Sequence, residues 1–306
     1  MPLLRPNDLV RLVSPASRPD PAGIERRAKI LRDWGLRVEV APHAFDQLSY
    51  LAGSDDDRLS DLTDALLDPK VRAVFATRVG KGSYRILHRL PFEAVARDPK
   101  PVVGFSDITA LHLALWRECR SIGVHGALTG DAEDRLSLIA ARSLRTVLME
   151  DGPFNVEVKQ ALASFELTTS GRARGRLIGG NLEMIATTSG WALPSLRGAI
   201  LLIESAGLAI GQFDRILTML MRAGHLNGVA GIAIGHVHGT PPNPPLDAIV
   251  LLRQHLSELN VPILGGLPIG HDADASSIVI GMMTEIDADH GTLIQRPEEM
   301  TTYDMR

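Results

Sequence analysis

Ser106 is the residue of this chain that is best placed to act as a nucleophile. An apolar run at 102–105 leads into Ser106, and a helical pattern starts at Ile108. A buried strand, a sharp turn and a helix present the nucleophilic hydroxyl in the G-x-S-x-G turn of the α/β-hydrolases. Gly104 and Ser106 match that motif, whereas Ile108 stands where its second glycine would be. The alternative is that Ser106 only caps the helix that follows.

Two further side chains follow apolar runs and would complete a catalytic relay with Ser106. Glu204 comes directly after the run at 199–203, and His271 follows the apolar stretch at 264–270. Ligands of open parallel sheets bind beyond the carboxyl ends of the strands. We therefore expect Ser106, Glu204 and His271, which follow such strands, to lie at the ligand-binding edge. A serine becomes nucleophilic when a neutral imidazole accepts its proton and a carboxylate orients that imidazole. The alternatives are a polar strand-end residue for Glu204 and a surface-loop histidine for His271.

The elements that must position these side chains alternate between strand and helix along the first half of the chain. Repeated units of a strand followed by a helix predict a parallel sheet with helices on both faces. The expected strands are residues 9–14, 36–40, 71–77 and 102–105, and the expected helices are residues 24–34, 56–67, 83–90 and 108–120.

A weaker pattern at about 150–175 separates this half from a second α/β region. We therefore predict an N-terminal domain at 1–150 that carries the serine, a connection at 151–175, and a C-terminal domain at 176–306. A hairpin is expected between 278–286 and 292–295. The other expected strands are residues 155–158, 175–178, 198–203, 229–235 and 261–265, and the expected helices are residues 181–188, 213–223 and 246–259.

Composition bounds the class of protein. The 306 residues are 45% hydrophobic and 22% charged, which is an ordinary globular balance. A net charge of −4 gives no basic field for nucleic acid, and 4% aromatic residues argue against base-stacking surfaces. The one cysteine, Cys119, excludes an intrachain disulfide and lies in an apolar helical pattern, where we expect it in the core. With no signal-peptide pattern and no membrane-span pattern, we expect a cytoplasmic protein without nucleic-acid or membrane partners.

At the residues already singled out, the chain resembles the LD-carboxypeptidase family of serine peptidases. This family includes muropeptide LD-carboxypeptidases and microcin C immunity-type peptidases. The resemblance implies an α/β fold with a flavodoxin-like parallel-sheet N-terminal domain that carries Ser106. It also implies a smaller C-terminal α/β domain that carries Glu204 and His271, a site in the cleft between the domains, and a homodimer. The matching segments are GFSDITAL at 104–111, GGNL at 179–182, LIE at 202–204 and GGLPIGH at 265–271.

The resemblance further implies an oxyanion hole made by the backbone N–H groups of Gly80 and Asp107. The family usually has Arg-Gly-Gly-Tyr-Gly where this chain has Arg-Val-Gly-Lys-Gly at 78–82. Gly80 matches the family glycine. Val79 and Lys81 replace a small residue and an aromatic residue, which changes the expected pocket wall near the leaving group.

Three residues are candidate substrate contacts, each with a structural alternative. Arg78 would offer a guanidinium to a substrate carboxylate, or it forms a surface ion pair. His125 would line the pocket, or it is a structural histidine. Asn181 would contact substrate, or it serves only as the N-cap of the helix that follows it.

Other polar residues near these segments are candidates for further roles. His236 and His238 project from one face of an extended segment as a metal pair would, but no third ligand follows at a diagnostic spacing, so we expect no metal. Asp272 and Asp274 either modulate the pKa of His271 or only solvate its loop. Trp191 either flanks the substrate cleft or packs in the core.

The sequence therefore predicts a serine carboxypeptidase without cofactors that acts on a small peptide. The substrate implied by the resemblance is a murein tetrapeptide with a terminal D-alanine, cleaved in peptidoglycan recycling. One alternative keeps the Ser-His-Glu relay and takes an aminoacyl-nucleotide analogue as substrate. The other is a ligand-binding protein of the same fold without catalytic activity.

Overall fold

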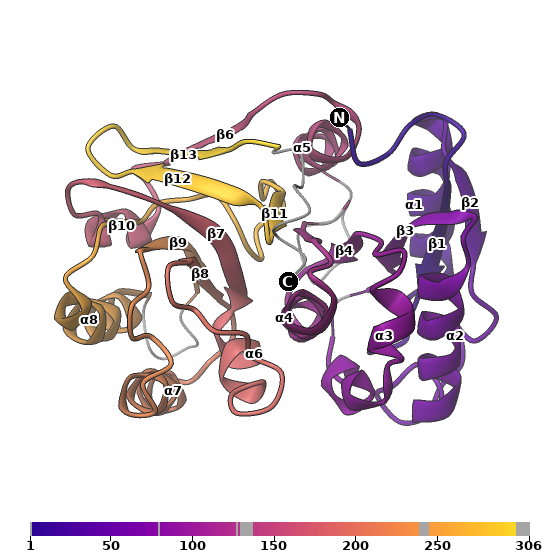
Figure 1. Ribbon diagram of the computed structural model, residues 1–306, viewed down its shortest axis with the longest axis horizontal. Helices are drawn as coiled ribbons and strands as arrows, with labels where there is room; N and C mark the ends of the chain where they lie inside the picture. The colour runs from indigo at the N-terminus through magenta and orange to yellow at the C-terminus, as the bar shows by residue number, and fades with distance from the viewer. Residues whose placement is uncertain (1, 79, 127, 129–136, 239–244, 298–306) are drawn as a thin grey trace.

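The computed structural model describes residues 2–78, 80–126, 128, 137–238 and 245–297, which build two β-sheets with flanking helices (Figure 1). In the first sheet the strand order is β11-β5-β4-β3-β1-β2. All neighbours are parallel except β11, which runs antiparallel to β5. The order β2-β1-β3-β4-β5 is that of the flavodoxin-like doubly wound fold, which confirms the predicted fold class. The strands are β1 (Leu9–Val13), β2 (Arg37–Val40), β3 (Val71–Ala76), β4 (Val102–Gly104), β5 (Gly123–His125) and β11 (Ile278–Ile280).

Alternation along the strands explains why helices cover both faces of this sheet. Leu9 and Val13 of β1 belong to one apolar cluster, whereas Val10 and Leu12 belong to another. Because successive strand side chains point to opposite faces, each face buries its own core. The first cluster includes α2 and α4, and the second includes α1 and α5. The helices of this region are α1 (Pro21–Asp33), α2 (Asp55–Leu67), α3 (Phe92–Val95), α4 (Ile108–Cys119) and α5 (Leu138–Met149), with 3-10 turns η1 (Ser83–Arg85) and η2 (Leu87–Arg89).

The second sheet is mixed, with strand order β10-β9-β8-β7-β12-β13-β6. The four strands from β10 to β7 are parallel, and the remaining pairs are antiparallel. The helices α6, α7 and α8 lie against one face of this sheet, below it in Figure 1. The strands are β6 (Phe154–Glu157), β7 (Arg172–Asn181), β8 (Ile200–Ser205), β9 (Gly231–Val237), β10 (Ile263–Leu264), β12 (Met283–Asp287) and β13 (Thr292–Gln295). The helices are α6 (Leu182–Thr187), α7 (Ile210–Arg222) and α8 (Pro245–Leu256), with 3-10 turns η3 (Ala163–Leu167) and η4 (Ser257–Leu259).

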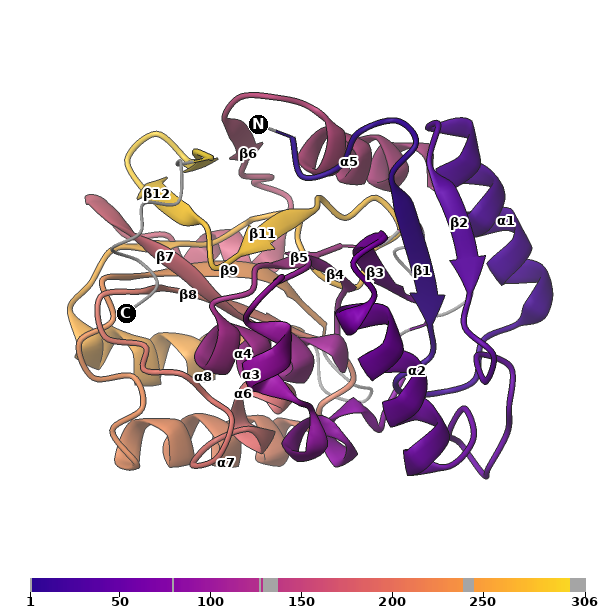
Figure 2. The ribbon, with the colours of Figure 1, turned by 45° about the vertical axis from the view of Figure 1, so that its right-hand side comes forward.

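The predicted strand at 278–286 is wrong in one respect, because it is two strands in different sheets. β11 joins the first sheet beside β5, whereas β12 pairs with β13 and β7 in the second (Figure 2). Gly281 separates them with a φ of +88°, and a Cβ there would lie 2.5 Å from the ring of Trp116. The chain turns at this glycine because only glycine tolerates both the conformation and the close approach. The hairpin between β12 and β13 is present as predicted.

Two other predictions concern the segments at 83–90 and 151–175. The helix expected at 83–90 is the pair of short 3-10 turns η1 and η2. The segment at 151–175, predicted to connect two domains, contains β6, which pairs with β13 of the second sheet. The proposed boundaries stay a prediction. Within the described residues, no helix combines the length and the apolar character that crossing a bilayer requires.

Candidate active site

Ser106 lies in the turn between β4 and α4 and has a left-handed backbone conformation, with a φ of +58°. Few residues other than glycine adopt this conformation, and those that do are concentrated at functional sites. The turn is tight, because a Cβ on Gly104 would lie 2.9 Å from the side chain of Ile108. Glycine at 104 thus makes room for isoleucine at the position where the hydrolase motif has its second glycine. The N-cap of α4 is Asp107, and no side chain caps the helix, so the Ser106 hydroxyl is not used as a helix cap.

The structure brings the Ser106 hydroxyl, the His271 imidazole and the Glu204 carboxylate into one hydrogen-bonded chain. The distance from Ser106 Oγ to His271 Nε2 is 3.0 Å, and that from His271 Nδ1 to Glu204 Oε2 is 2.8 Å. When the Nδ1–H group donates to the carboxylate, Nε2 is left to accept the proton of the serine. Ser106 comes from the first sheet, whereas Glu204 and His271 come from the second-sheet region. This is the geometry of a nucleophile, a base and an orienting acid.

Local strand irregularities aim Glu204 at His271. Glu204 is fully buried near the carboxyl end of β8, and the pairing between β8 and β9 shifts register between Ile203 and Ser205. Such bulges are common beside active sites, where they redirect a side chain. Gly270, with a φ of +131°, leaves space for the carboxylate, because a Cβ there would lie 3.1 Å from Glu204 Oε2.

His271 and Glu204 each stabilise the charged form of the other. Burial disfavours protonation of His271, but the charge of Glu204, its hydrogen bond and the charge of Asp272 outweigh burial, so the pKa of His271 is raised. Burial favours the neutral form of Glu204, but His271, His125 and the Asn181 side chain outweigh it, so the pKa of Glu204 is lowered. Glu204 therefore stays ionised beside an imidazole whose proton affinity it increases.

The two predicted oxyanion-hole residues belong to segments that are bound to each other. The buried Asp107 carboxylate accepts hydrogen bonds from the backbone N–H of Gly82 at 3.2 Å and of Ser83 at 2.8 Å. The Ser83 hydroxyl donates to the Asp107 carbonyl at 2.9 Å. Gly80 packs against Ser17, whose Oγ would lie 2.4 Å from a Cβ at position 80. The role of both N–H groups stays a prediction, and Val79 lies outside the described residues.

The three candidate substrate contacts have different surroundings. Arg78 is exposed and donates to the Arg18 carbonyl at 2.9 Å. His125 is buried, which lowers its pKa to about 4, and its ring lies edge-on to Phe105. Asn181 caps α6, because its side-chain oxygen accepts from the N–H groups of Glu183 and Met184. Contact of any of the three with substrate stays a prediction.

Two residues that support the site were not identified from the sequence. Phe105 lies edge-on to the His271 ring, with centroids 5.0 Å apart. The Thr109 hydroxyl oxygen accepts a hydrogen bond from the Asn181 N–H at 3.1 Å, which joins α4 to the end of β7. Phe105 is adjacent to Ser106 in the sequence, and Thr109 lies about one helical turn after it, so their positions could have suggested a role. Their partners, His271 and Asn181, lie too far along the chain to be inferred.

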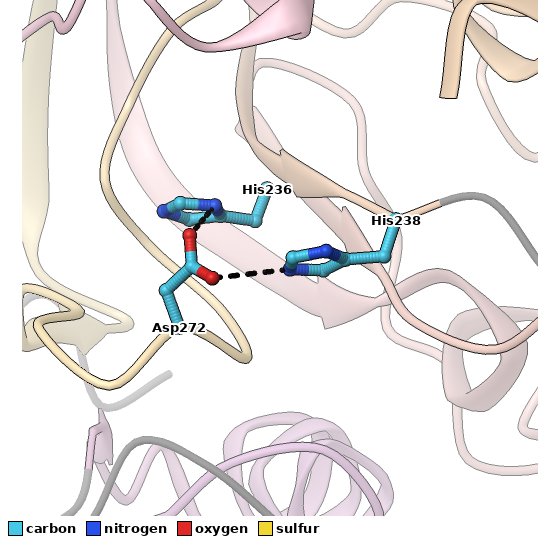
Figure 3. A group of neighbouring side chains, drawn as sticks. All are labelled: His236, His238 and Asp272. Carbon is cyan, nitrogen blue, oxygen red and sulfur yellow. Dashed lines mark ion pairs between the residues drawn. The ribbon is translucent and has the colours of Figure 1, made fainter. Parts of the chain in front are cut away.

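The remaining candidates also have defined environments. Cys119 is buried as predicted, and burial raises the pKa of its thiol to about 11. Trp191 is 40% exposed, so of its two alternatives the one that places it in the core is wrong. Asp274 accepts a hydrogen bond from the Ser137 hydroxyl at 2.6 Å. Asp272 contacts both His236 and His238, so the third group that sequence spacing did not supply for this histidine pair is present (Figure 3).

Comparisons with known proteins agree along most of the chain. Residues 10–126 match the family model for the LD-carboxypeptidase N-terminal domain, and residues 174–286 match that for the LD-carboxypeptidase C-terminal domain. A Streptomyces coelicolor protein named as a carboxypeptidase is 36% identical over 302 residues, which cover 96% of this chain and 95% of that protein. A Bacillus subtilis protein named as a murein peptide carboxypeptidase is 30% identical, covering 95% and 92%. The structure of the microcin self-immunity protein MccF in complex with aspartyl sulfamoyl adenosine has a similar fold, with a TM-score of 0.83, 21% identity and 98% coverage of both chains.

Proposed function

Because this chain belongs to the LD-carboxypeptidase family, a family of carboxypeptidase-type hydrolases, we propose that Ser106, His271 and Glu204 are its catalytic triad. The observation that carries the proposal is the hydrogen-bonded chain of hydroxyl, imidazole and carboxylate, with links of 3.0 Å and 2.8 Å. The left-handed conformation of Ser106 supports the proposal, because strained backbone positions cluster at active sites.

In the proposed reaction, Ser106 Oγ attacks the carbonyl carbon of the scissile amide while His271 Nε2 accepts the hydroxyl proton. Glu204 holds the imidazole through Nδ1–H and stabilises its protonated form. The oxygen that becomes negatively charged accepts hydrogen bonds from the N–H groups of Gly80 and Asp107. His271 then gives its proton to the leaving amine, and an acyl-enzyme ester remains on Ser106. Water attacks this ester with the same base, which releases the carboxylic acid and restores the hydroxyl.

The proposed substrate is a murein tetrapeptide, and the bond cleaved is the amide to its terminal D-alanine. The name of the Bacillus subtilis relative, a murein peptide carboxypeptidase, supports this choice. The second candidate substrate is an aminoacyl-nucleotide analogue, supported by the ligand in the MccF structure of similar fold. Under the first candidate the enzyme belongs to peptidoglycan recycling. A cytoplasmic location and a homodimer remain predictions.

The test compares release of D-alanine from a murein tetrapeptide with cleavage of aspartyl sulfamoyl adenosine, both followed by mass spectrometry. We expect faster turnover of the tetrapeptide by the wild-type chain and no turnover by Ser106→Ala. Ser49→Ala is the matched control, because Ser49 is an exposed serine that also has a left-handed conformation, with a φ of +56°. Turnover by folded Ser106→Ala would refute the triad. Preference for the nucleotide analogue would leave the triad intact and reassign the substrate.

A further inference from the structure

A second group of ionisable side chains lies beside the proposed triad and makes no hydrogen bond in its chain of hydroxyl, imidazole and carboxylate. His236 and His238 extend from the end of β9 and the residue after it, and Asp272 follows His271. Figure 3 shows the Asp272 carboxylate between the two imidazoles, with one oxygen toward each. Asp272 Oδ2 contacts His236 Nδ1 closely, and Asp272 Oδ1 lies 3.6 Å from His238 Nε2. One ligand atom from each residue lies within 4.8 Å of those from the other two.

The backbone holds these side chains in a fixed arrangement. The His236 N–H donates to the Ile269 carbonyl at 2.8 Å, and the His238 N–H donates to the Ser205 carbonyl at 2.9 Å. The two imidazoles lie on the same side of the segment 236–238, because both contact Asp272. Their rings are stacked, with centroids 5.6 Å apart and planes inclined by 8°. The fold already orders these side chains, so a bound ligand would cost them little further conformational entropy, whereas this cost weakens many surface sites.

Burial separates this group from an ordinary surface ion pair. His236 is 6% exposed. Within the described residues, the Nε2 atoms of His236 and His238 are buried and have no hydrogen-bond partner. Buried polar atoms normally have partners, so an unsatisfied imidazole pair needs an explanation. A metal ion held between Asp272 and the two rings would give His238 Nε2 a partner, because this is the His238 nitrogen that faces Asp272 (Figure 3).

We propose that His236, His238 and Asp272 bind one divalent transition-metal ion of the zinc class. Two imidazole nitrogens and one carboxylate oxygen are ligands that Zn²⁺ accepts, and three protein ligands leave a fourth position for water. His238 and Asp272 are about 40% exposed in their side chains, so the ion can enter from solvent. The bound ion ties the loop that carries His271 to the end of β9. This inference does not depend on the proposed peptidase activity.

A second cluster, formed by His43, Asp46 and Asp57, provides an internal comparison. Its ligand atoms also lie within 4.8 Å of one another. Its side chains are 40–47% exposed, so none is buried as His236 is. Without a buried ligand such as His236, we expect no specific metal binding there.

The test is calorimetric titration of the full chain, stripped of metal by a chelator, with Zn²⁺. We expect one bound ion per chain and a rise in the thermal unfolding midpoint, because a ligand that binds only the folded state stabilises it. His238→Gln and Asp272→Asn should each weaken binding by at least ~10-fold, since even the loss of a residue that only supports a metal ligand has that effect. The control Asp46→Asn should bind as the wild type does. The visible absorption spectrum of Co²⁺ bound in place of Zn²⁺ should change in His238→Gln and stay the same in Asp46→Asn.

Two outcomes would overturn the proposal. One is no saturable Zn²⁺ binding by the wild-type chain, which would leave the group as an ion pair only. The other is binding that survives in both His238→Gln and Asp272→Asn, or that is lost in Asp46→Asn. Far-ultraviolet circular dichroism without metal establishes that each variant is folded, and two ligand variants are compared so that the misfolding of one does not decide the result.

Discussion

Ser106 presents its hydroxyl to His271 from a backbone conformation that costs a non-glycine residue roughly 1–2 kcal/mol. The conformation that aims the hydroxyl at His271 therefore lowers the stability of the folded chain. Such strain persists only where the surrounding structure enforces it, here the close contact between residue 104 and Ile108.

The first prediction separates the two effects. Ser106→Ala keeps the strain and Ser106→Gly relieves it, while both remove the nucleophile. We expect both variants to lose at least ~10⁴-fold in kcat. The glycine variant should be the more stable of the two by about 1 kcal/mol in its free energy of unfolding in urea. Ser49→Gly, at the other left-handed serine, should keep full activity. Equal stability of the two Ser106 variants would show that the turn is not strained.

The second prediction concerns the charge of Glu204. His271 must be neutral to accept a proton, so kcat/KM falls as the pH drops through the pKa of His271. Burial lowers this pKa, but the charge and the hydrogen bond of Glu204 outweigh burial and raise it. Glu204→Gln removes that charge and leaves burial, which lowers the pKa of His271. The acid limb of the pH profile should therefore move to lower pH. The remaining activity should fall by about 10⁴-fold, as when a triad carboxylate becomes an amide. The pH dependence of kcat/KM measures both, and an acid limb that stays in place would contradict the coupling.

The sequence identified Ser106, Glu204 and His271 because each follows an apolar run whose end could be recognised. It did not reveal that Asp272 meets His236 and His238, since that contact joins segments 34 residues or more apart along the chain. Nor did it show the conformation of Ser106, because left-handed residues other than glycine leave no compositional signal. Distances among side chains from different strands depend on tertiary packing, which spacing alone does not encode.

At the scale of elements, β11 and β12 show that an apolar pattern does not predict which sheet a strand joins. The apolar run at 278–286 predicted one strand, but its two parts pair with different sheets. Strand preference is set largely by the neighbours that a strand meets, and these lie far away in the sequence. The parallel sheet formed by β1 to β4 was accessible, because repeated strand and helix units leave few right-handed arrangements. β5 (Gly123–His125) was not among the expected strands, and the flavodoxin-like order was implied only by the family resemblance.

The third prediction tests the turn between β11 and β12. Gly281→Ala places a Cβ 2.5 Å from the Trp116 ring in a left-handed residue, so it combines overpacking with backbone strain. We expect a loss of about 2–4 kcal/mol in the free energy of unfolding. Gly190→Ala is the matched control, because its φ is +82° and nothing lies within 4 Å of the added Cβ. It should lose only the strain contribution, about 1–2 kcal/mol. Equal losses in chemical denaturation would show that Trp116 moves aside freely.

At the scale of the whole molecule, the site depends on how the two sheets are joined. Ser106 is supplied by the first sheet, and Glu204 and His271 are supplied by the second-sheet region. The hydrogen bond from the Asn181 N–H to the buried Thr109 Oγ1 links α4 to β7, where Asn181 is the register partner of Glu204. β11 makes a second link, since it continues the first sheet while its neighbours along the chain belong to the second.

The fourth prediction tests the link at Thr109. Thr109→Val keeps the shape of the side chain but removes the acceptor, which leaves a buried N–H without a partner. The expected cost is about 1–3 kcal/mol in the free energy of unfolding. The kcat should fall because the Asn181 and Glu204 segments are adjacent in register. Thr109→Ser, which keeps the hydroxyl, should recover most of the lost activity. Failure of the serine variant to do so would assign the effect to packing.

The most direct test of the triad is labelling of the folded chain with a fluorophosphonate, followed by mass spectrometry of the intact protein and its peptides. Because His271 and Glu204 activate only one serine, we predict a single covalent adduct on the peptide that contains Ser106. His271→Gln should label far more slowly, and Ser106→Ala should not label at all. A folded wild-type chain that gains no mass, or that carries the adduct on another serine, would contradict the assignment of Ser106 as the nucleophile.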